Sequence, residues 1–267
     1  MDTVLNIGTR ALLAMQGSIN TVSHNITNAN TPGYSRQEAQ LSTAGGQFSG
    51  AGFFGHGVDL TMVRRQYDQF LTNAVQATTA ASSSDAARAS GLQALDKLFA
   101  DAQQGLGASL DAVFAAAGDL ANRPADPSSR QAFLARATQF ADRVTAVGGQ
   151  IQTLVRSADG KLALDAKQVN DRLTELKQLN QQIATVGQAG QPPNDLLDQR
   201  DAALQSLNGL LAVNAVRQDD GTMAVFTTSG AALLVGTQQG RLDAVPDGSD
   251  PSLHALRLTV GSTTQFL

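Results

Sequence analysis

The first thirty residues carry a seam of small and apolar side chains that repeats every seven residues. Its positions are Leu5, Gly8, Leu12, Met15, Ile19, Val22 and Ile26. This spacing predicts a helix from Thr3 to Asn30 whose seam packs against another helix. Arg10 is the only formally charged residue inside that range, whereas a solvated helix normally carries several Lys and Glu residues. The pattern indicates a helix that is contacted on several sides. The alternative is a sparsely charged terminal amphipathic helix.

A turn and a glycine-rich stretch follow this helix. Pro32 disfavours helix at Thr31, and the Pro-Gly-Tyr sequence that begins at Pro32 is typical of a turn. Glycines are frequent at 45–57, which predicts an irregular connector. Short strands are predicted on either side of it, at Glu38–Leu41 and Val58–Val63.

Helical periodicity resumes near Gln66 and continues to about residue 212. The first helical face is interrupted at Ser82–Ser84, and a later helix ends in the turn at 122–127. A long apolar seam then runs from Phe133 to Ile183 with one phase slip. Asp159-Gly160 could be a turn that divides this seam. Because the seam continues through that dipeptide, we predict a single helix from 129 to 186.

The predicted length of that helix has a consequence for the shape of the molecule. At about 1.5 Å per residue it would extend roughly 87 Å. A compact globule of this chain length has a diameter of only about 50 Å. The sequence therefore predicts an elongated molecule.

The pattern changes to short β runs after residue 212. A shorter helix, capped by Asn194 or Asp195, comes first. The β runs are Val213–Val216, Met223–Thr227, Leu233–Val235, Arg241–Val245 and Leu256–Val260. Turn residues separate them, which predicts an antiparallel meander. Because the chain stops soon after the last run, we expect this β portion to be incomplete.

These patterns predict a mainly α protein with a β portion. We expect an elongated, coiled-coil-like helical bundle together with an antiparallel β-meander. Four segments are expected along the chain: an N-terminal helix and turn (1–34), an extended connector (35–65), a long helical bundle (66–212) and a β-rich segment (213–267).

Composition narrows the possible functions. The chain has 267 residues, and 16% of them are charged, against roughly 25% in an average soluble domain. With 19 basic and 23 acidic residues and no basic cluster, nucleic acid is not an expected partner. The sequence has no cysteine, which excludes disulfides and a thiol nucleophile. No apolar run is long enough to insert into a membrane, and we see no cleavable signal peptide.

Candidate chemical sites are few. The sequence Gly50-Ala-Gly-Phe-Phe-Gly55 matches a dinucleotide-binding pattern, but the run before it is not a strand and a strand-like segment follows it, so we interpret it as connector. The three histidines, His24, His56 and His254, lack metal-ligand spacing. Asp195, Asp198 and Asp201 lie on one helix face, which favours capping and salt bridges to Arg200 over a metal site. We therefore expect no enzyme activity, no cofactor, no metal and no catalytic residues.

The segment from Ala11 to Tyr34 closely resembles the N-terminal signature of bacterial flagellar axial proteins, which include rod, hook and hook-associated proteins. The signature turn comprises Asn25, Asn28, Asn30, Thr31, Pro32, Gly33 and Tyr34. His24 stands where an asparagine is more usual in that family. Two later segments, Gly57–Asp68 and Pro193–Asp201, resemble the hook-associated protein 1 family of the hook–filament junction.

The resemblance implies a structural role without chemistry. In that family the N-terminal helix pairs with a C-terminal helix, and neighbouring subunits cover the remaining faces. Subunit packing would then fall on Leu5, Leu12, Met15, Ile19, Val22 and Ile26. Because no pairing C-terminal helix is present in this sequence, we expect the first thirty or so residues of the isolated chain to be poorly ordered or frayed.

The resemblance also implies partners and a location. The subunits would assemble into a ring or short helical segment between the hook protein and a second junction protein. The flagellar type III export machinery would secrete them to the extracellular flagellum. Two alternatives remain, a distal rod or hook protein of the same axial family and a secreted coiled-coil tether.

Overall fold

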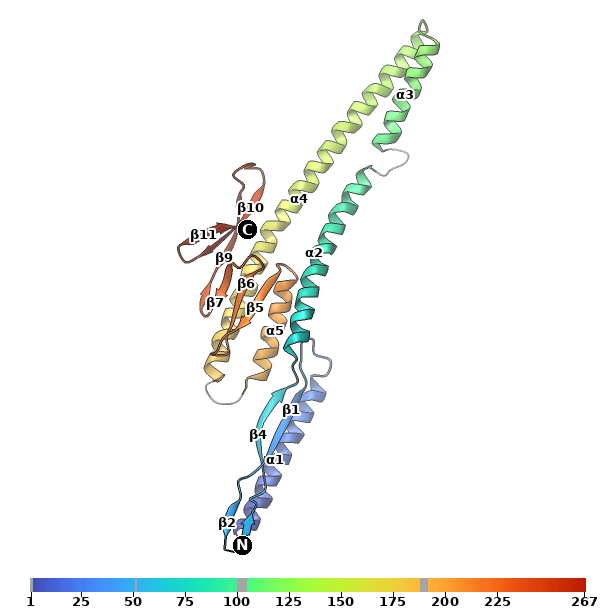
Figure 1. Ribbon diagram of the computed structural model, residues 1–267. Helices are drawn as coiled ribbons and strands as arrows, with labels where there is room; N and C mark the ends of the chain where they lie inside the picture. The colour runs from blue at the N-terminus through green and yellow to red at the C-terminus, as the bar shows by residue number, and fades with distance from the viewer. Residues whose placement is uncertain (1, 51, 100–104, 188–191) are drawn as a thin grey trace. The chain divides into compact units, whose positions relative to one another are not determined.

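The computed structural model describes residues 2–50, 52–99, 105–187 and 192–267. Figure 1 shows long helices together with small antiparallel sheets, which confirms the predicted fold class. The helices are α1 (Asp2–Thr27), α2 (Gln69–Phe99), α3 (Leu106–Asn122), α4 (Pro127–Gly187) and α5 (Asn194–Asn208). The strands are β1 (Gln37–Thr43), β2 (Gln47–Ser49), β3 (Gly52–Phe54), β4 (Val58–Arg65), β5 (Val213–Arg217), β6 (Met223–Thr227), β7 (Ala232–Val235), β8 (Gln238–Gln239), β9 (Arg241–Pro246), β10 (His254–Val260) and β11 (Thr263–Phe266).

The chain forms two compact units. Unit 1 comprises residues 1–81, 167–242 and 258–265, and unit 2 comprises 82–166, 243–257 and 266–267. The four-segment division expected from the sequence follows the order of the elements and stays a prediction.

The helix boundaries agree with the sequence patterns in most places. The first helix ends at Thr27, three residues before the predicted end, and hydrogen-bonded turns replace its last residues. The predicted interruption at Ser82–Ser84 is wrong, because α2 continues through it. Serine costs only a fraction of a kcal/mol in a helix interior, so three serines do not stop a helix of 31 residues.

The longest helix is α4, with 61 residues and no break at Asp159-Gly160. Pro127 is its first residue, a position where a missing N–H costs nothing. The Asp126 carboxylate accepts hydrogen bonds from the Ser128 N–H and the Ser129 hydroxyl, both at 3.0 Å. These bonds lower the pKa of Asp126 and fix the start of the helix.

The sheets are all antiparallel. In the β1–β4 pair, Gln37 lies opposite Arg65 at one end and Thr43 lies opposite Val58 at the other. A bulge follows Gln40. A small hairpin, β2–β3, lies inside the glycine-rich connector, so the prediction of an irregular connector is wrong there. Sheet orders β5-β6-β7-β8 and β11-β10-β9 follow the sequence, which confirms the meander.

The core of unit 1 lies where α4 and α5 meet the β5–β8 sheet. Its fully buried side chains include Leu173, Leu176, Leu204, Leu207, Val225, Leu233 and Leu234. Two asparagines of α4 attach the strands to the helix through backbone hydrogen bonds. The Asn180 amide bonds both the N–H and the C=O of Met223, and Asn170 does the same for Leu242.

Unit 2 contains α3 and the first two thirds of α4. The described residues of α3 include none that is buried. A polar contact joins α4 to the start of β10. The Asp159 carboxylate accepts a hydrogen bond from the His254 N–H at 2.6 Å and lies 2.7 Å from His254 Nδ1. These bonds lower the pKa of Asp159, and the His254 imidazole makes the largest contribution.

Candidate assembly helix and polar joint

The helix α1 has two different faces. One face holds the small residues Ala14 and Thr21, which are 2% and 8% exposed and face the β1–β4 hairpin. The predicted seam lies roughly on the opposite side, because successive residues turn by about 100° around a helix. Its large side chains are between 50% and 74% exposed, at Leu5, Leu12, Met15, Ile19, Val22 and Ile26. No described residue of this chain buries these side chains, and their role in subunit packing stays a prediction.

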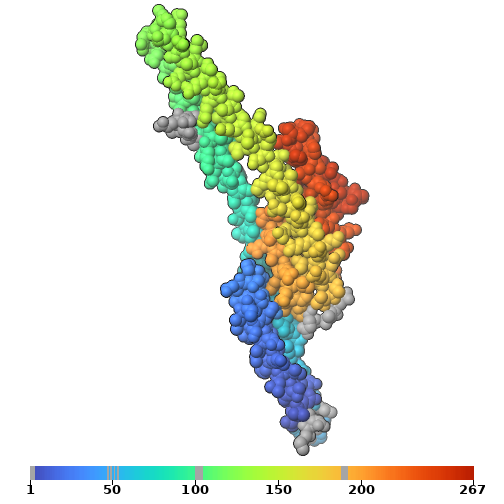
Figure 2. All heavy atoms as spheres, turned by 180° about the vertical axis from the view of Figure 1, so that it is seen from behind, coloured from blue at the N-terminus to red at the C-terminus, as the bar shows by residue number. Residues whose placement is uncertain are grey.

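A close approach explains the small residues on the other face. A Cβ at Gly17 would lie 2.5 Å from Leu60 Cδ2 of β4. At the start of α1, the Arg10 guanidinium pairs with the Asp59 carboxylate at 3.1 Å. The helix and the hairpin thus form one body, called here the arm (residues 2–65). Figure 2 shows α1, in blue, at the outer surface of the molecule.

The signature turn closes the arm where α1 ends and β1 begins. The Asn25 Oδ1 atom accepts hydrogen bonds from the Tyr34 hydroxyl at 2.7 Å and from the Gln37 N–H at 2.8 Å. The Asn25 Nδ2 atom donates to the Gln37 C=O at 2.8 Å. Gly33 takes a left-handed conformation with φ of 81°, which a side chain rarely adopts. These hydrogen bonds and the conformation of Gly33 together fix the path of the backbone between α1 and β1.

The other signature residues lie around this turn. Asn28 donates to the His24 C=O at 3.1 Å, and the Thr31 hydroxyl donates to Asn28 Oδ1 at 3.2 Å. Asn30 and Pro32 are exposed. The structure thus brings Asn25, Asn28, Thr31 and Tyr34 together at the signature turn.

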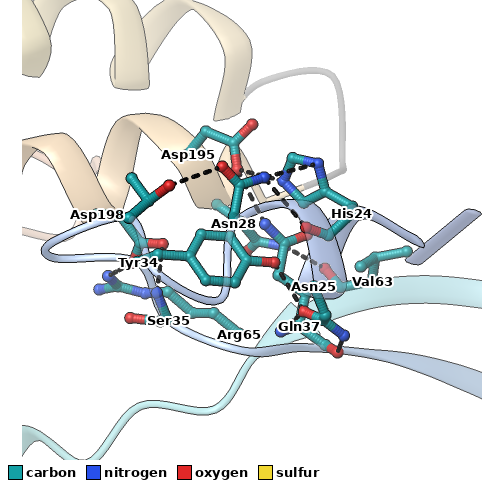
Figure 3. Close-up of polar contacts among 12 residues, drawn as sticks. His24, Asn25, Asn28, Tyr34, Ser35, Gln37, Val63, Arg65, Asp195 and Asp198 are labelled. Carbon is teal, nitrogen blue, oxygen red and sulfur yellow. Dashed lines mark hydrogen bonds and ion pairs between the residues drawn. The ribbon is translucent and has the colours of Figure 1, made fainter. Parts of the chain in front are cut away.

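A buried ionic cluster connects the arm to α5, and Figure 3 shows part of it. Arg65, at the end of β4, lies 2.9 Å from Asp198 Oδ1 and 2.7 Å from Asp201 Oδ2. The Ser35 N–H donates to the other oxygen of Asp198 at 2.9 Å. The Arg65 guanidinium also stacks over the Tyr67 ring at 4.1 Å.

Further contacts reach the first turn of α5. The Asn194 amide donates to the Val63 C=O at 2.8 Å, and the Gln37 amide donates to Asp195 Oδ1 at 2.9 Å. His24 lies 3.4 Å from the same Asp195 oxygen. All of these contacts join residues of the arm to residues 194–201, a set called here the polar joint.

The helix α5 separates the joint from the core. Asn194, Asp195, Asp198 and Asp201 lie on one side of it. Leu204 and Leu207, both 0% exposed, lie on the other side and pack into the core of unit 1. The arm is therefore attached to the polar side of a helix whose apolar side is anchored.

The joint changes the protonation behaviour of two groups. Burial raises the pKa of the Tyr34 hydroxyl, and the negative charges of Asp195 and Asp198 add to this effect. Burial lowers the pKa of Arg200, with Asp201 opposing the shift. Arg200 Nη1 donates to the Gly221 C=O at 3.0 Å, which links the joint to the turn before β6.

The structure corrects one prediction at α5 and confirms part of another. The helix has Pro193 at its N-cap position with no side-chain cap, so the predicted cap by Asn194 or Asp195 is wrong. Those side chains instead bond to the arm. Arg200 lies 3.7 Å from Asp201, but the shorter ion pairs of the aspartates go to Arg65. Among the described residues, no group of three His, Asp or Glu side chains is arranged to hold a metal ion.

Comparison with known families decides the assignment. The family described as "Flagellar hook-associated protein FlgK helical domain" matches residues 92–266. The chain belongs to the FlgK family. A second family, described as "Flagella basal body rod protein", matches residues 5–34.

Individual FlgK relatives agree with this assignment. The chain is 32% identical to flagellar hook-associated protein 1 of Salmonella typhimurium over 94% of its length and 46% of that protein. It is 24% identical to the Bacillus subtilis protein of the same name, over 97% of this chain and 53% of that protein. The solved structure of the flagellar hook junction protein FlgK from Burkholderia pseudomallei is 30% identical, with a TM-score of 0.59 over 74% of this chain and 35% of that one. The chain spans about half the length of these curated FlgK relatives.

The joint shows which functional residues the sequence analysis missed. Arg65 lies inside the segment 57–68 that carried the resemblance to this family, but its pairing with α5 was not predicted. Its partner Asp198 is 133 positions away in the chain. The sequence offered one signal for this pairing. Two adjacent arginines, Arg64 and Arg65, lie in the segment 57–68, and three aspartates lie in the segment 193–201.

Proposed function

We propose that this chain is part of a structural component of the bacterial flagellum that joins the hook to the filament. The exposed seam of α1 carries the proposal, together with membership of the FlgK family. Six large apolar side chains on one helix face lower the free energy when a neighbour covers them, by about 25 cal/mol per Å² of apolar area. Lateral packing of subunits would provide that cover, so the protein would act without catalysis.

The partners and location follow from the same proposal. The subunits would form a ring or short helical segment, with hook protein on one side and a second junction protein on the other. They would reach the cell exterior through the flagellar export machinery. In the described part of the chain, no helix is both long and apolar enough to cross a membrane.

Co-sedimentation with isolated hooks tests the seam. We expect the wild-type protein to sediment with hooks and to remain in solution without them. A variant with Leu12→Asn and Ile19→Asn should stay in solution, because it places two amides in the interface. The matched control is Leu13→Asn, which changes an exposed leucine on the flank of the same helix. The proposal is wrong if the double variant sediments as the wild type does.

A distal rod or hook protein remains the second candidate. It is favoured by the match of residues 5–34 to the rod protein family. The same experiment separates the two, because a hook or rod protein should polymerise alone. Tubes formed by the purified wild-type protein, seen by electron microscopy, would support this candidate over a junction role.

A further inference from the structure

The contacts that attach the arm to α5 are mainly ion pairs and hydrogen bonds between polar side chains. Ion pairs and hydrogen bonds join the arm to α5. The seam of α1 faces away from its own hairpin and remains exposed. At the turn the backbone comes close to α5, because a Cβ on Gly33 would be 3.3 Å from the Ala202 Cβ. Among the described residues of the arm, the buried apolar side chains are the small ones of Ala14 and Ala44, so large apolar side chains contribute little to the attachment.

A groove beside the joint leaves room for the arm to move. It has a volume of about 660 Å³ and lies between α1, the hairpin and residues 192–196. Its walls include Asn20 and His24 from α1, Leu60 from β4 and Pro193 before α5. Because this space is not filled by side chains, packing alone does not fix the angle between α1 and α5.

Three charged side chains of the joint are largely buried. The side chains of Arg65 and Asp198 are each 8% exposed, and that of Asp201 is 15% exposed. Removing the Arg65 charge would leave two carboxylates with too little compensation while the arm stays docked. Those carboxylates would be hydrated if the arm moved away. Loss of the Arg65 charge therefore destabilises the docked position of the arm relative to a released position, in which water hydrates the two carboxylates.

We propose that Arg65, with Asp198 and Asp201, forms an electrostatic latch that fixes the orientation of the arm on α5. Arg65 is a positioning residue, because it acts on the arm through the carboxylates of α5. The latch does not depend on the proposed assembly function, since it concerns the free subunit. Within an assembly it would present the seam in one orientation, which reduces the entropy lost on binding.

The absence of cysteine makes the latch directly measurable. Two introduced cysteines are the only thiols in the chain, so spin labels attach at chosen positions. One pair, Thr9→Cys with Ser206→Cys, places labels on the arm and on α5 at exposed positions. A second pair, Thr9→Cys with Thr43→Cys, places both labels inside the arm. Pulsed electron–electron double resonance on the full chain then gives the distribution of distances between the two spin labels of each pair.

The expected results separate a latch from a purely structural role. The wild-type chain should give one narrow distribution for each pair. Arg65→Met should broaden the arm-to-α5 distribution at least about twofold, because methionine keeps an unbranched apolar stem but has no charge to pair with the carboxylates. Arg65→Lys should keep the wild-type distance because it keeps the charge. The control Arg10→Gln, which breaks an ion pair inside the arm, should leave the arm-to-α5 distance unchanged.

Four outcomes would overturn the proposal. The latch is absent if the wild-type arm-to-α5 distribution is already broad while the pair inside the arm is narrow, or if Arg65→Met leaves the arm-to-α5 distribution narrow. The charge is not the cause if Arg65→Lys broadens it as much as Arg65→Met does. If Arg65→Met also broadens the pair inside the arm, Arg65 serves the folding of the arm and does not position it.

Discussion

The helices α1 and α5 carry similar sequence patterns and lie in opposite environments. Both have leucines seven residues apart, Leu5 and Leu12 in one and Leu197 and Leu204 in the other. Leu204 is 0% exposed in the core of unit 1, whereas Leu12 is 73% exposed. In the described part of the chain, the β1–β4 hairpin covers the small-residue face of α1. A heptad pattern thus identifies a face that binds something, and the rest of the chain decides whether the partner is internal.

Hydrogen exchange should show the largest difference between the two helices. In the monomer we expect the backbone amides of Leu5–Ile26 to exchange about 100-fold faster than those of α5, because α1 lacks a covered apolar face. Mass spectrometry of deuterium uptake at neutral pH measures both helices in one sample. Equal protection of α1 and α5 would mean that the hairpin alone stabilises the arm, and the expected fraying would be wrong.

Alanine substitutions should separate the two helices in stability. Leu204→Ala should lower the free energy of unfolding by about 2–5 kcal/mol, because it leaves a cavity in a closed core. Leu12→Ala should change it by no more than about 0.5 kcal/mol in the monomer, because that side chain is already in water. Urea denaturation of each variant measures both values. A loss at Leu12 as large as that at Leu204 would show that the seam is covered within the chain.

These differences mark how far the sequence could predict the structure. Local periodicity predicted α1, the unbroken α4 and the meander, because each depends on side chains close together in the chain. It failed at Ser82–Ser84, where residues of modest helix propensity remain helical because the segments before and after them are helical. It also missed the joint, since the pairing of Arg65 with Asp198 depends on how distant segments meet. The signature turn was recognised by resemblance, and its bonds to Asn25 became visible only in three dimensions.

Two glycines of α1 test its two faces in the same helix. Gly8→Ala should raise the free energy of unfolding by up to about 1 kcal/mol, because no atom lies within 4 Å of the added Cβ and alanine favours helix. Gly17→Ala gains the same propensity but forces the tip of Leu60 to move, which costs about 1–3 kcal/mol. We therefore expect a loss of up to about 2 kcal/mol in urea denaturation. If Gly17→Ala stabilises the chain as Gly8→Ala does, the close packing of α1 on β4 is wrong.

The smallest expected effect is on stability at acid pH, and it concerns the contact between Asp159 and His254 in unit 2. His254 lowers the pKa of Asp159 below its ordinary value of 3.8. A carboxylate whose pKa is lower in the folded state stabilises that state above its unfolded pKa, and this contribution is lost as the pH falls through the folded value. Asp159→Asn should therefore reduce the loss of stability on acidification below pH 3.8, measured by thermal unfolding between pH 2 and 6. Adding His254→Ala to Asp159→Asn should change that acid dependence little further, because the contact is already broken. An unchanged acid dependence in Asp159→Asn would show that His254 does not hold this carboxylate in solution.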